Sequence, residues 1–253
     1  MKAMILAAGR GERMRPLTDS LPKPMLKVAG IPLIEHHIIK LAQAGITDIV
    51  INHAWLGDKI ENYLKDGSQW GVSIKYSRES EGGLETAGGI INALPLLLEN
   101  TDANAPFLVV NGDVYTDFDF ADIKPLTEDC LANIWLVKNP EHNSKGDFLL
   151  ADIASMNVNN SDISESSDSQ KVRNITAKIT DKTEPLPFTF SGIGLYKPEF
   201  FNAHKNENIL ALGPLLREAA DNQQLSGKLL TCHWTDVGTP ERLDELNRIV
   251  SGK

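Results

Sequence analysis

The segment of residues 6–27 (LAAGRGERMRPLTDSLPKPMLK) combines glycines with cationic side chains in a pattern that favours the binding of an anion. A continuous apolar run, residues 3–8, leads directly into Gly9 and Gly11. Glycines let backbone N–H groups approach an anion closely, and arginine and lysine neutralise its charge. The pattern therefore predicts a phosphate-binding loop, with a tight turn that carries surface charges as the alternative. The cations of the segment are Arg10, Arg13, Arg15, Lys23 and Lys27.

The spacing of these residues excludes two common phosphate-binding loops. A Walker loop needs Gly-Lys-Ser/Thr after its first glycine, and no such triplet follows Gly9. The dinucleotide fingerprint needs a third glycine, and the required offset after Gly11 holds another residue. The loop therefore belongs to neither class.

Two aspartates stand at positions that suit a ligand site. Asp113 follows the apolar run 107–110 in the triplet Asn111-Gly112-Asp113, and Asp236 lies in the late segment 234–240 (WTDVGTP). Open α/β sheets bind ligands at the carboxyl ends of their buried strands. Either aspartate, taken alone, would also suit a helix cap or a turn.

The first segment resembles the signature of the sugar-1-phosphate nucleotidyltransferases, a strand followed by G-x-G-x-R-x-x-P-x-T and then by Pro-Lys-Pro. The late segment resembles the W-x-D-x-G-T motif of the same family. Glu12 departs from the Ser or Thr that the family commonly has there, but a backbone amide supplies the contact at that position. The resemblance extends from residue 3 to about residue 246. The matching positions of the first motif are Gly9, Gly11, Arg13, Pro16, Thr18 and Pro22-Lys23-Pro24.

Enzymes of this family join a nucleoside triphosphate to a sugar 1-phosphate and release pyrophosphate. The resemblance implies that Arg13 steadies the departing pyrophosphate and that Lys23 neutralises charge around the α-phosphoryl group. Asp113 and Asp236 are expected to hold Mg²⁺, which proteins usually bind through one or two carboxylates plus substrate phosphates. The nucleotide-binding residues implied in the glycine loop are Ala8, Gly9, Gly11, Glu12 and Arg13, together with Lys23.

The segment 81–89 (EGGLETAGG) matches the base-binding loop of the family, with Glu85, Thr86 and Gly88 as expected nucleotide contacts. Backbone groups of this loop could pair with uracil. Glu85 could equally accept hydrogen bonds from N1–H and N2–H₂ of guanine. The nucleotide is expected to be UTP, and the loop leaves GTP open.

The expected contacts to the sugar are Asn111, Gly146 and Ser191, which fall where the family binds its hexose. Many relatives also carry a Glu-Lys-Pro whose lysine meets the sugar phosphate. Lys178 in Thr176-Ala177-Lys178-Ile179 is a poor match to that motif.

Three segments point to one branch of the family: LETAGGI, NGDVYTDFDF and FTFSGIGLY. They resemble the uridylyltransferases that act on N-acetylmuramic acid α-1-phosphate in bacterial peptidoglycan recycling. A mannose-1-phosphate guanylyltransferase or a glucose-1-phosphate nucleotidyltransferase is the alternative within the family. A non-catalytic, nucleotide-sugar-binding regulatory subunit is the alternative of another class. The presence of Arg13, Lys23, Asp113 and Asp236 favours an enzyme over that subunit.

Apolar runs alternate with helical patterns in the first half of the chain, which predicts βαβ units and a mostly parallel sheet. The expected class is α/β, a Rossmann-like, mostly parallel mixed sheet flanked by helices, and the resemblance implies the GT-A-like nucleotidyltransferase architecture. Predicted strands are 3–8, 48–52, 72–76, 107–110, 131–137, 188–196 and 228–234. Predicted helices are 32–45, 58–65, 86–98 with an interruption at Pro95, 209–220 and 240–250.

The stretch 154–171 contains six serines and only four apolar residues, too few to bury a core face. It is expected to be a polar insertion loop within one nucleotidyltransferase domain, residues 1–253.

The chain of 253 residues carries a net charge of −9, which disfavours nucleic acid and anionic lipid as partners. Its apolar runs are too short to span a bilayer, and the first of them ends in glycine and arginine, unlike a secretory signal. We expect a cytoplasmic protein, a monomer or a small homo-oligomer. Its expected partners are a nucleoside triphosphate and a sugar 1-phosphate.

Overall fold

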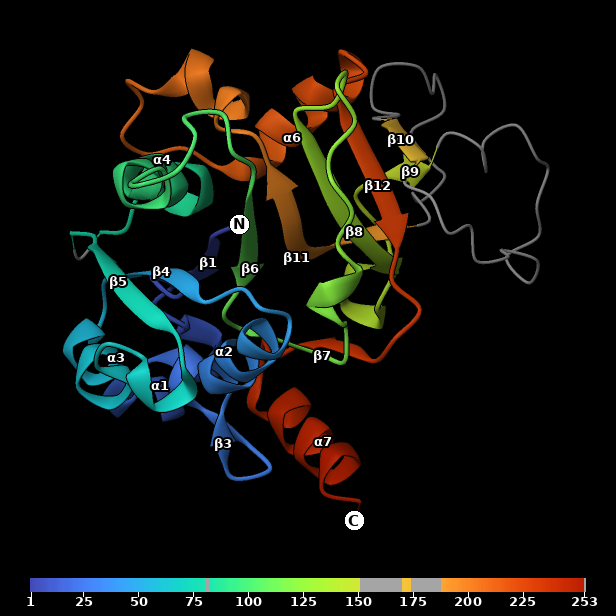
Figure 1. The fold of residues 1–253 in the computed structure, drawn as a ribbon. Coiled ribbons are helices and arrows are strands. Elements are labelled where there is room, and N and C mark those ends of the chain that lie inside the picture. Colours follow the sequence, from blue (N-terminus) through green and yellow to red (C-terminus); the bar gives the residue numbers. More distant parts are fainter. Residues whose placement is uncertain (81, 151–169, 174–187, 253) are drawn as a thin grey trace.

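A central sheet of nine strands runs through the computed structural model, which describes residues 1–80, 82–150, 170–173 and 188–252. The strand order is β5-β4-β1-β6-β11-β8-β12-β10-β9 (Figure 1). From one edge to the other, the strands are β5 (Ser73–Arg78), β4 (Asp48–His53), β1 (Ala3–Leu6), β6 (Phe107–Asn111), β11 (Phe188–Tyr196), β8 (Ala132–Lys138), β12 (Leu225–Leu229), β10 (Gln170–Arg173) and β9 (Leu149–Leu150).

The half of the sheet around β1 is parallel. β1 pairs with β4 on one side and with β6 on the other, and β4 pairs with β5. The register places Leu6, the last residue of β1, level with Asn52 of β4 and Asn111 of β6. The carboxyl ends of these strands therefore meet at one edge of the sheet, where open α/β sheets bind ligands.

The other half of the sheet is mixed. β11 pairs antiparallel with both β6 and β8, β12 runs parallel to β8, and β10 pairs antiparallel with β12 and with β9. The predicted α/β class, with a mostly parallel mixed sheet flanked by helices, is confirmed.

The predicted strand 228–234 is wrong, because this part of the chain belongs to two strands. β12 ends at Leu229, and the N–H of Leu230 makes a last bond to the carbonyl of Leu136 in β8. The chain then leaves β8, and β13 (Trp234–Asp236) pairs antiparallel with β7 (Val114–Thr116) in a separate ribbon. A second short ribbon joins β2 (Lys27–Val28) to β3 (Ile31–Pro32).

Helices cover both faces of the sheet (Figure 1). On β1, Met4 packs in a core cluster with α4 and α6, whereas Ala3 and Ile5 pack in a second cluster with α2 and α3. This division follows from the alternation of side chains along a strand. The helices are α1 (Leu17–Ser20), α2 (Leu33–Gln43), α3 (Gly57–Leu64), α4 (Glu85–Leu97), α6 (Leu212–Asp221) and α7 (Pro240–Val250).

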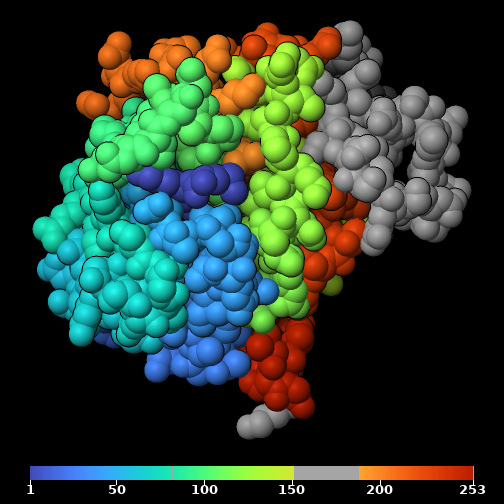
Figure 2. All heavy atoms as spheres, viewed as in Figure 1, coloured from blue at the N-terminus to red at the C-terminus, as the bar shows by residue number. Residues whose placement is uncertain are grey.

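The strand β1 is enclosed by this packing, and only a narrow strip of the N-terminal residues, in dark blue, reaches the face of the molecule in Figure 2. α4 continues through Pro95, so the predicted interruption is wrong. The helix ends two residues later at Leu97, where the N–H of Leu98 still bonds to the carbonyl of Leu94.

Most of the predicted insertion loop, residues 154–169, lies outside the described residues, as does Lys178. The last two residues of that stretch, Gln170 and Lys171, are part of β10 and pair with Gly227 and Ser226 of β12. None of the helices in the described part of the chain has both the length and the hydrophobicity of a bilayer-spanning segment.

The buried side chain of His37 on α2 gives the fold a dependence on pH. Burial is the main reason that the pKa of His37 is lowered to about 4, since a buried imidazole holds a proton less readily than an exposed one. Between pH 6.5 and pH 4 the unfolded chain therefore binds a proton at this position that the folded chain does not bind.

We expect this proton to lower the free energy of unfolding by up to about 3 kcal/mol as the pH falls through that window. The stability is fully present above pH 6.5 and is lost towards pH 4. Urea unfolding between pH 7 and pH 4 would compare the natural chain with a His37→Leu variant, which should lose less stability over the same range. Equal pH slopes for the two proteins would contradict the lowered pKa.

Candidate active site

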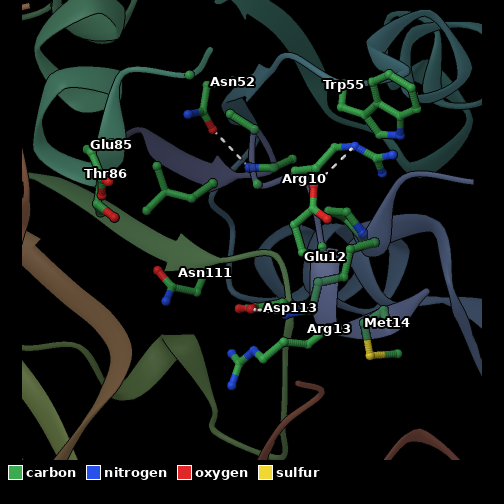
Figure 3. Close-up of a pocket in the computed structure, with 18 of the residues that line it drawn as sticks. Arg10, Glu12, Arg13, Met14, Asn52, Trp55, Glu85, Thr86, Asn111 and Asp113 are labelled. Carbon is green, nitrogen blue, oxygen red and sulfur yellow. Dashed lines mark hydrogen bonds and ion pairs between the residues drawn. The ribbon is translucent and has the colours of Figure 1, made fainter. Parts of the chain in front are cut away.

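A cavity of about 450 Å³ opens at the carboxyl edge of β1, β4 and β6 (Figure 3). Its size is typical of small-molecule sites. Figure 3 shows Glu85 and Thr86 on one side of it and Arg10 and Trp55 on the other. Most of the residues predicted to bind ligands line this cavity: Ala8, Gly9, Gly11, Glu12, Arg13, Lys23, Glu85, Thr86, Asn111 and Asp113.

The glycine loop after β1 is shaped by Gly11, whose φ of 70° lies in the left-handed region. A Cβ added here would lie 3.0 Å from Cγ2 of Thr18 and 3.1 Å from Cβ of Lys23. The hydroxyl of Thr18 donates to the carbonyl of Gly11 at 2.8 Å. Backbone conformation and close packing therefore both require glycine at this position.

Lys23 and Asp113 form an ion pair in the cavity, with 2.5 Å between Nζ and Oδ2. Lys23 is only 9% exposed, so its charge is shielded from water and interacts strongly with groups inside the cavity. Asp113 is positioned by the preceding turn, in which the N–H of Gly112 donates to the carbonyl of Leu6 at 2.8 Å. A Cβ on Gly112 would lie 2.7 Å from that carbonyl oxygen, so only glycine allows this close approach.

Asn111 is held from behind by β11. The strand has a register shift between Phe190 and Gly194, and a Cβ on Gly192 would lie 2.7 Å from Nδ2 of Asn111. The backbone of Gly192, in this irregular part of β11, therefore packs directly against one side of the Asn111 side-chain amide. The opposite side of that amide faces the cavity.

Arg10 and Trp55 form a stacked pair on the cavity wall, with the guanidinium carbon 3.7 Å from the centre of the indole ring. Both side chains donate to the carbonyl of Thr18, at 3.0 and 3.2 Å. The stack holds a cation over an aromatic face, while Glu12 and Asp19 lie 3.7 and 3.8 Å from the same guanidinium. Trp55 lies at the rim of the cavity. Its position in the sequence, two residues after the end of β4 at the ligand-binding edge of the sheet, is the feature from which this role could be predicted.

Glu85 begins α4 with a φ of 60°, a left-handed conformation that is unusual outside glycine. In the first turn of the helix, the N–H groups of Ala87 and Gly88 both donate to the carbonyl of Leu210, at 2.9 and 3.0 Å. Gly88 does not line the cavity, and a Cβ on it would lie 2.7 Å from the carbonyl oxygen of Asn208. Its N–H therefore closes the helix end against the chain rather than facing a ligand.

Asp236 also lies outside the cavity lining. Nη1 of Arg242 donates to both of its carboxylate oxygens, at 2.7 and 2.6 Å, and Nε2 of His142 lies 2.9 Å away. The three side chains line a second hollow, between β12, β13 and α7. The backbone nevertheless brings Asp236 close to the cavity, since the N–H of Val237 donates to the carbonyl of Asp113 at 2.8 Å.

The two other predicted sugar contacts lie apart from the cavity lining. Gly146 is in a turn, with its N–H bonded to the carbonyl of Asn143 at 3.1 Å. Ser191 is fully buried in β11, where its carbonyl accepts from Nε1 of Trp234 at 2.8 Å.

The sequence of residues 2–252 matches the family described as nucleotidyl transferase. The chain belongs to the nucleotidyl transferase family. It is 50% identical over 249 residues to the N-acetylmuramate alpha-1-phosphate uridylyltransferase of Neisseria meningitidis serogroup B, a match that covers 97% of this chain and 96% of the relative. It is 31% identical over 243 residues to the enzyme of the same name from Caulobacter vibrioides, covering 94% of this chain and 92% of that one. The expected membership of the family is confirmed.

The fold is also that of a solved structure. A putative glucose-1-phosphate thymidylyltransferase from Bacillus anthracis, in complex with a sucrose, superposes with a TM-score of 0.74 at 24% identity. The match covers 98% of this chain and 94% of that structure. At this identity the likeness concerns the fold alone.

A divalent cation would find part of its ligand set in this nucleotidyl transferase. Asp113 presents a carboxylate to the cavity, and Asp236 stands on the adjacent strand with its carboxylate bound to Arg242. No group of three or more metal-ligating side chains occurs among the described residues. These donors therefore suit a Mg²⁺ ion whose remaining ligands come from substrate phosphates and water. They do not suit a metal site whose ligands all come from the protein.

Replacement of Gly11 by alanine should weaken the binding of a nucleoside triphosphate about tenfold or more. The added methyl group would press on Thr18 and Lys23 and would displace the ammonium group of Lys23 from its place in the cavity. Gly71 offers a matched control, because its φ of 71° is nearly the same and an added Cβ there meets nothing within 4 Å.

Both alanine variants should lose about 1–2 kcal/mol of stability from the left-handed backbone. Calorimetric titration with a nucleoside triphosphate would separate them, since only Gly11→Ala should lose affinity. Equal affinities for the two variants would contradict the role assigned to the loop.

Proposed function

We propose that this nucleotidyl transferase joins UTP to N-acetylmuramic acid α-1-phosphate, forming UDP-N-acetylmuramic acid and releasing pyrophosphate. The observation that carries the proposal is the 50% identity to a uridylyltransferase of that name, nearly end to end in both chains. The cavity supports it, because the glycine loop, three cations (Arg10, Arg13 and Lys23) and the carboxylate of Asp113 are all part of its lining.

The chemistry requires positioning and charge neutralisation rather than a base. An oxygen of the sugar phosphate attacks the α-phosphorus of UTP in line, a new P–O bond forms, and the bond to the β-phosphate breaks. The attacking phosphate monoester is mostly dianionic at pH 7, because its second pKa is near 6. The main difficulty is the approach of one anion to another.

The residues of the cavity have distinct parts in this scheme. Backbone amides of the loop from Ala8 to Arg13 receive the triphosphate, and the Arg13 guanidinium neutralises the departing pyrophosphate. Lys23, nearly buried beside Asp113, places its charge at the α-phosphoryl group. Lys23 is shielded from water, so its interaction with the phosphate is stronger than it would be on the surface, whereas Arg13 is exposed at the rim of the cavity.

Asp113 and Asp236 would hold Mg²⁺ together with the substrate phosphates. The ion would supply further neutralisation of phosphate charge during transfer. Asp236 would have to exchange its bonds to Arg242 and His142 for this role. Asn111 lies at the cavity and is the sugar contact that the geometry supports, whereas Gly146 and Ser191 stay predictions.

The base is the point on which a second candidate rests. Glu85 lines the cavity, and a carboxylate there could accept two hydrogen bonds from guanine. A guanylyltransferase acting on mannose 1-phosphate is therefore the second candidate. Peptidoglycan recycling in the cytoplasm is the setting that the first candidate implies.

A release assay for pyrophosphate decides between the candidates. The purified chain is incubated with Mg²⁺, with each of the four nucleoside triphosphates in turn, and with a panel of sugar 1-phosphates. We expect release with UTP and N-acetylmuramic acid α-1-phosphate. A preference for GTP with mannose 1-phosphate would replace the first candidate with the second, and no release with any pair would argue against an enzyme.

Asp113→Asn should lower kcat about a thousandfold or more, because the amide removes the charge that holds the cation but keeps the shape of the side chain. Asp117→Asn is a matched control. Asp117 is an exposed aspartate at the other end of β7, and its ion pair with Lys40 is long, at 3.9 Å. Removal of Mg²⁺ with EDTA should abolish pyrophosphate release by the natural chain, and added Mg²⁺ should restore that activity.

Thermal unfolding of both variants would show that the fold is kept. Turnover close to that of the natural chain in Asp113→Asn, or activity that persists in EDTA, would refute the metal assignment.

A further inference from the structure

A chain of three hydrogen bonds connects the glycine loop to the start of α4 behind the cavity. The backbone N–H of Ala7 donates to Oδ1 of Asn52 at 2.9 Å, and Nδ2 of Asn52 donates to Oε1 of Glu79 at 2.6 Å. The other carboxylate oxygen of Glu79 accepts from the N–H of Leu84 at 3.1 Å. Neither side chain is part of the motifs that identify the family in this sequence.

The two ends of this series of hydrogen bonds lie in the two segments that a nucleotide would contact. Ala7 leads directly into the loop that is assigned to the triphosphate. Leu84 precedes Glu85 and Thr86, which are assigned to the base. Asn52 itself lines the cavity and is only 2% exposed, so its bonds are shielded from competing water.

We propose that Asn52 and Glu79 are positioning residues for the nucleotide, which act by fixing the base-binding segment relative to the triphosphate loop. The inference rests on the proposed function, since it takes the cavity as the nucleotide site. A ligand that spans both segments gains full affinity only if their separation is already correct before it binds.

The segment at Leu84 needs this support. The next residue, Glu85, has a φ of 60°, a conformation that persists only where the surroundings hold it. The N–H of Leu84 is held by Glu79, and its carbonyl accepts from the N–H of Leu210 at 3.1 Å. Leu84, which precedes the strained residue, is thus anchored through both its N–H and its carbonyl.

The second turn of α4 also packs against the pair. A Cβ on Gly89 would lie 2.5 Å from Oε1 of Glu79 and 2.8 Å from Nδ2 of Asn52. Only a glycine allows the helix to approach the pair so closely. Gly89→Ala therefore offers a way to displace the pair without altering any polar group.

The direction of the bonds makes the proposal testable. Both ends of the chain are backbone N–H donors, so the outer atoms of the two side chains must accept. The inner atoms must then be one donor and one acceptor, as in Asn52 with Glu79. The exchanged pair, Asn52→Asp with Glu79→Gln, satisfies the same rule with the inner bond reversed.

The single variants break the rule. In Glu79→Gln two donors face each other, and in Asn52→Asp two carboxylate oxygens do, so each variant loses a bond in every orientation of the side chains. A buried donor left without its partner costs far more than an exposed one. We expect either single variant to bind UTP about tenfold more weakly, and the exchanged pair to restore affinity to within about threefold of the natural chain.

Calorimetric titration with two probes, UTP and inorganic tripolyphosphate, would test this positioning role. Tripolyphosphate reaches only the glycine loop, so its affinity should be the same in the natural chain and in Glu79→Gln. In the pyrophosphate assay the same variant should raise KM for UTP and leave kcat nearly unchanged. Gly89→Ala should behave in the same way.

Glu99→Gln is the control, since Glu99 pairs with Lys75 on the surface away from the cavity. It should bind both probes as the natural chain does. An unchanged UTP affinity in Glu79→Gln would overturn the proposal, and so would a failure of the exchanged pair to recover affinity. Equal loss of UTP and tripolyphosphate would also overturn it, because that result indicates a general loss of structure.

The proposed function fails separately from this inference. If the natural chain binds UTP but releases no pyrophosphate with any sugar phosphate, the enzyme proposal falls while the binding comparison still decides the role of Asn52 and Glu79. If neither UTP nor GTP binds to the natural chain, both proposals are wrong.

Discussion

The parallel register of β1 with its two neighbours is the constraint on which the cavity depends. One row of the sheet contains Leu6, Asn52 and Asn111, and each of the three strands ends within a residue of that row. The glycine loop, the amide of Asn52 and the Asn-Gly-Asp turn therefore leave the sheet at the same level. A shift of β4 or β6 by one residue would turn these side chains to the opposite face, and the cavity would lose two of its walls.

Side chains of opposite charge are paired around this edge of the sheet. Lys23 is paired with Asp113, Arg242 with Asp236, and Arg10 lies near Glu12 and Asp19. Shielded charges are costly unless they are paired, so these contacts stabilise a cavity that has to hold cations. A chain with a net charge of −9 thus collects positive charge locally, with Lys23, Arg10 and Arg242 each beside a carboxylate.

The sequence predicts the parts of the site that depend on local chain conformation. Gly11 and Asp113 lie in turns within five residues of the end of an apolar strand, and the sequence of the neighbouring residues is enough to indicate such turns. Of the two partners of Asp236, Arg242 is close in sequence, but His142 could not be predicted in this way, because it comes from a distant segment and reaches Asp236 only in the folded chain. Asn52 and Glu79 belong to no motif: the register of the sheet places Asn52 level with Leu6, and only the folded chain brings Glu79 against Asn52. The prediction of one strand over residues 228–234 is wrong for a similar reason, since an apolar run does not show where the pairing partner changes.

Three glycines, Gly89, Gly112 and Gly192, touch the site from behind without lining it, against Glu79, Leu6 and Asn111 respectively. Because these three residues have no side chain, the backbone can pack closely against the residues that line or support the cavity, and this close packing sets the shape of the cavity. The positions least tolerant of mutation should therefore lie partly outside the surface that a substrate touches. Residues that face the ligand can be exchanged to accept a different base or sugar, whereas the three positions behind them have to remain glycine.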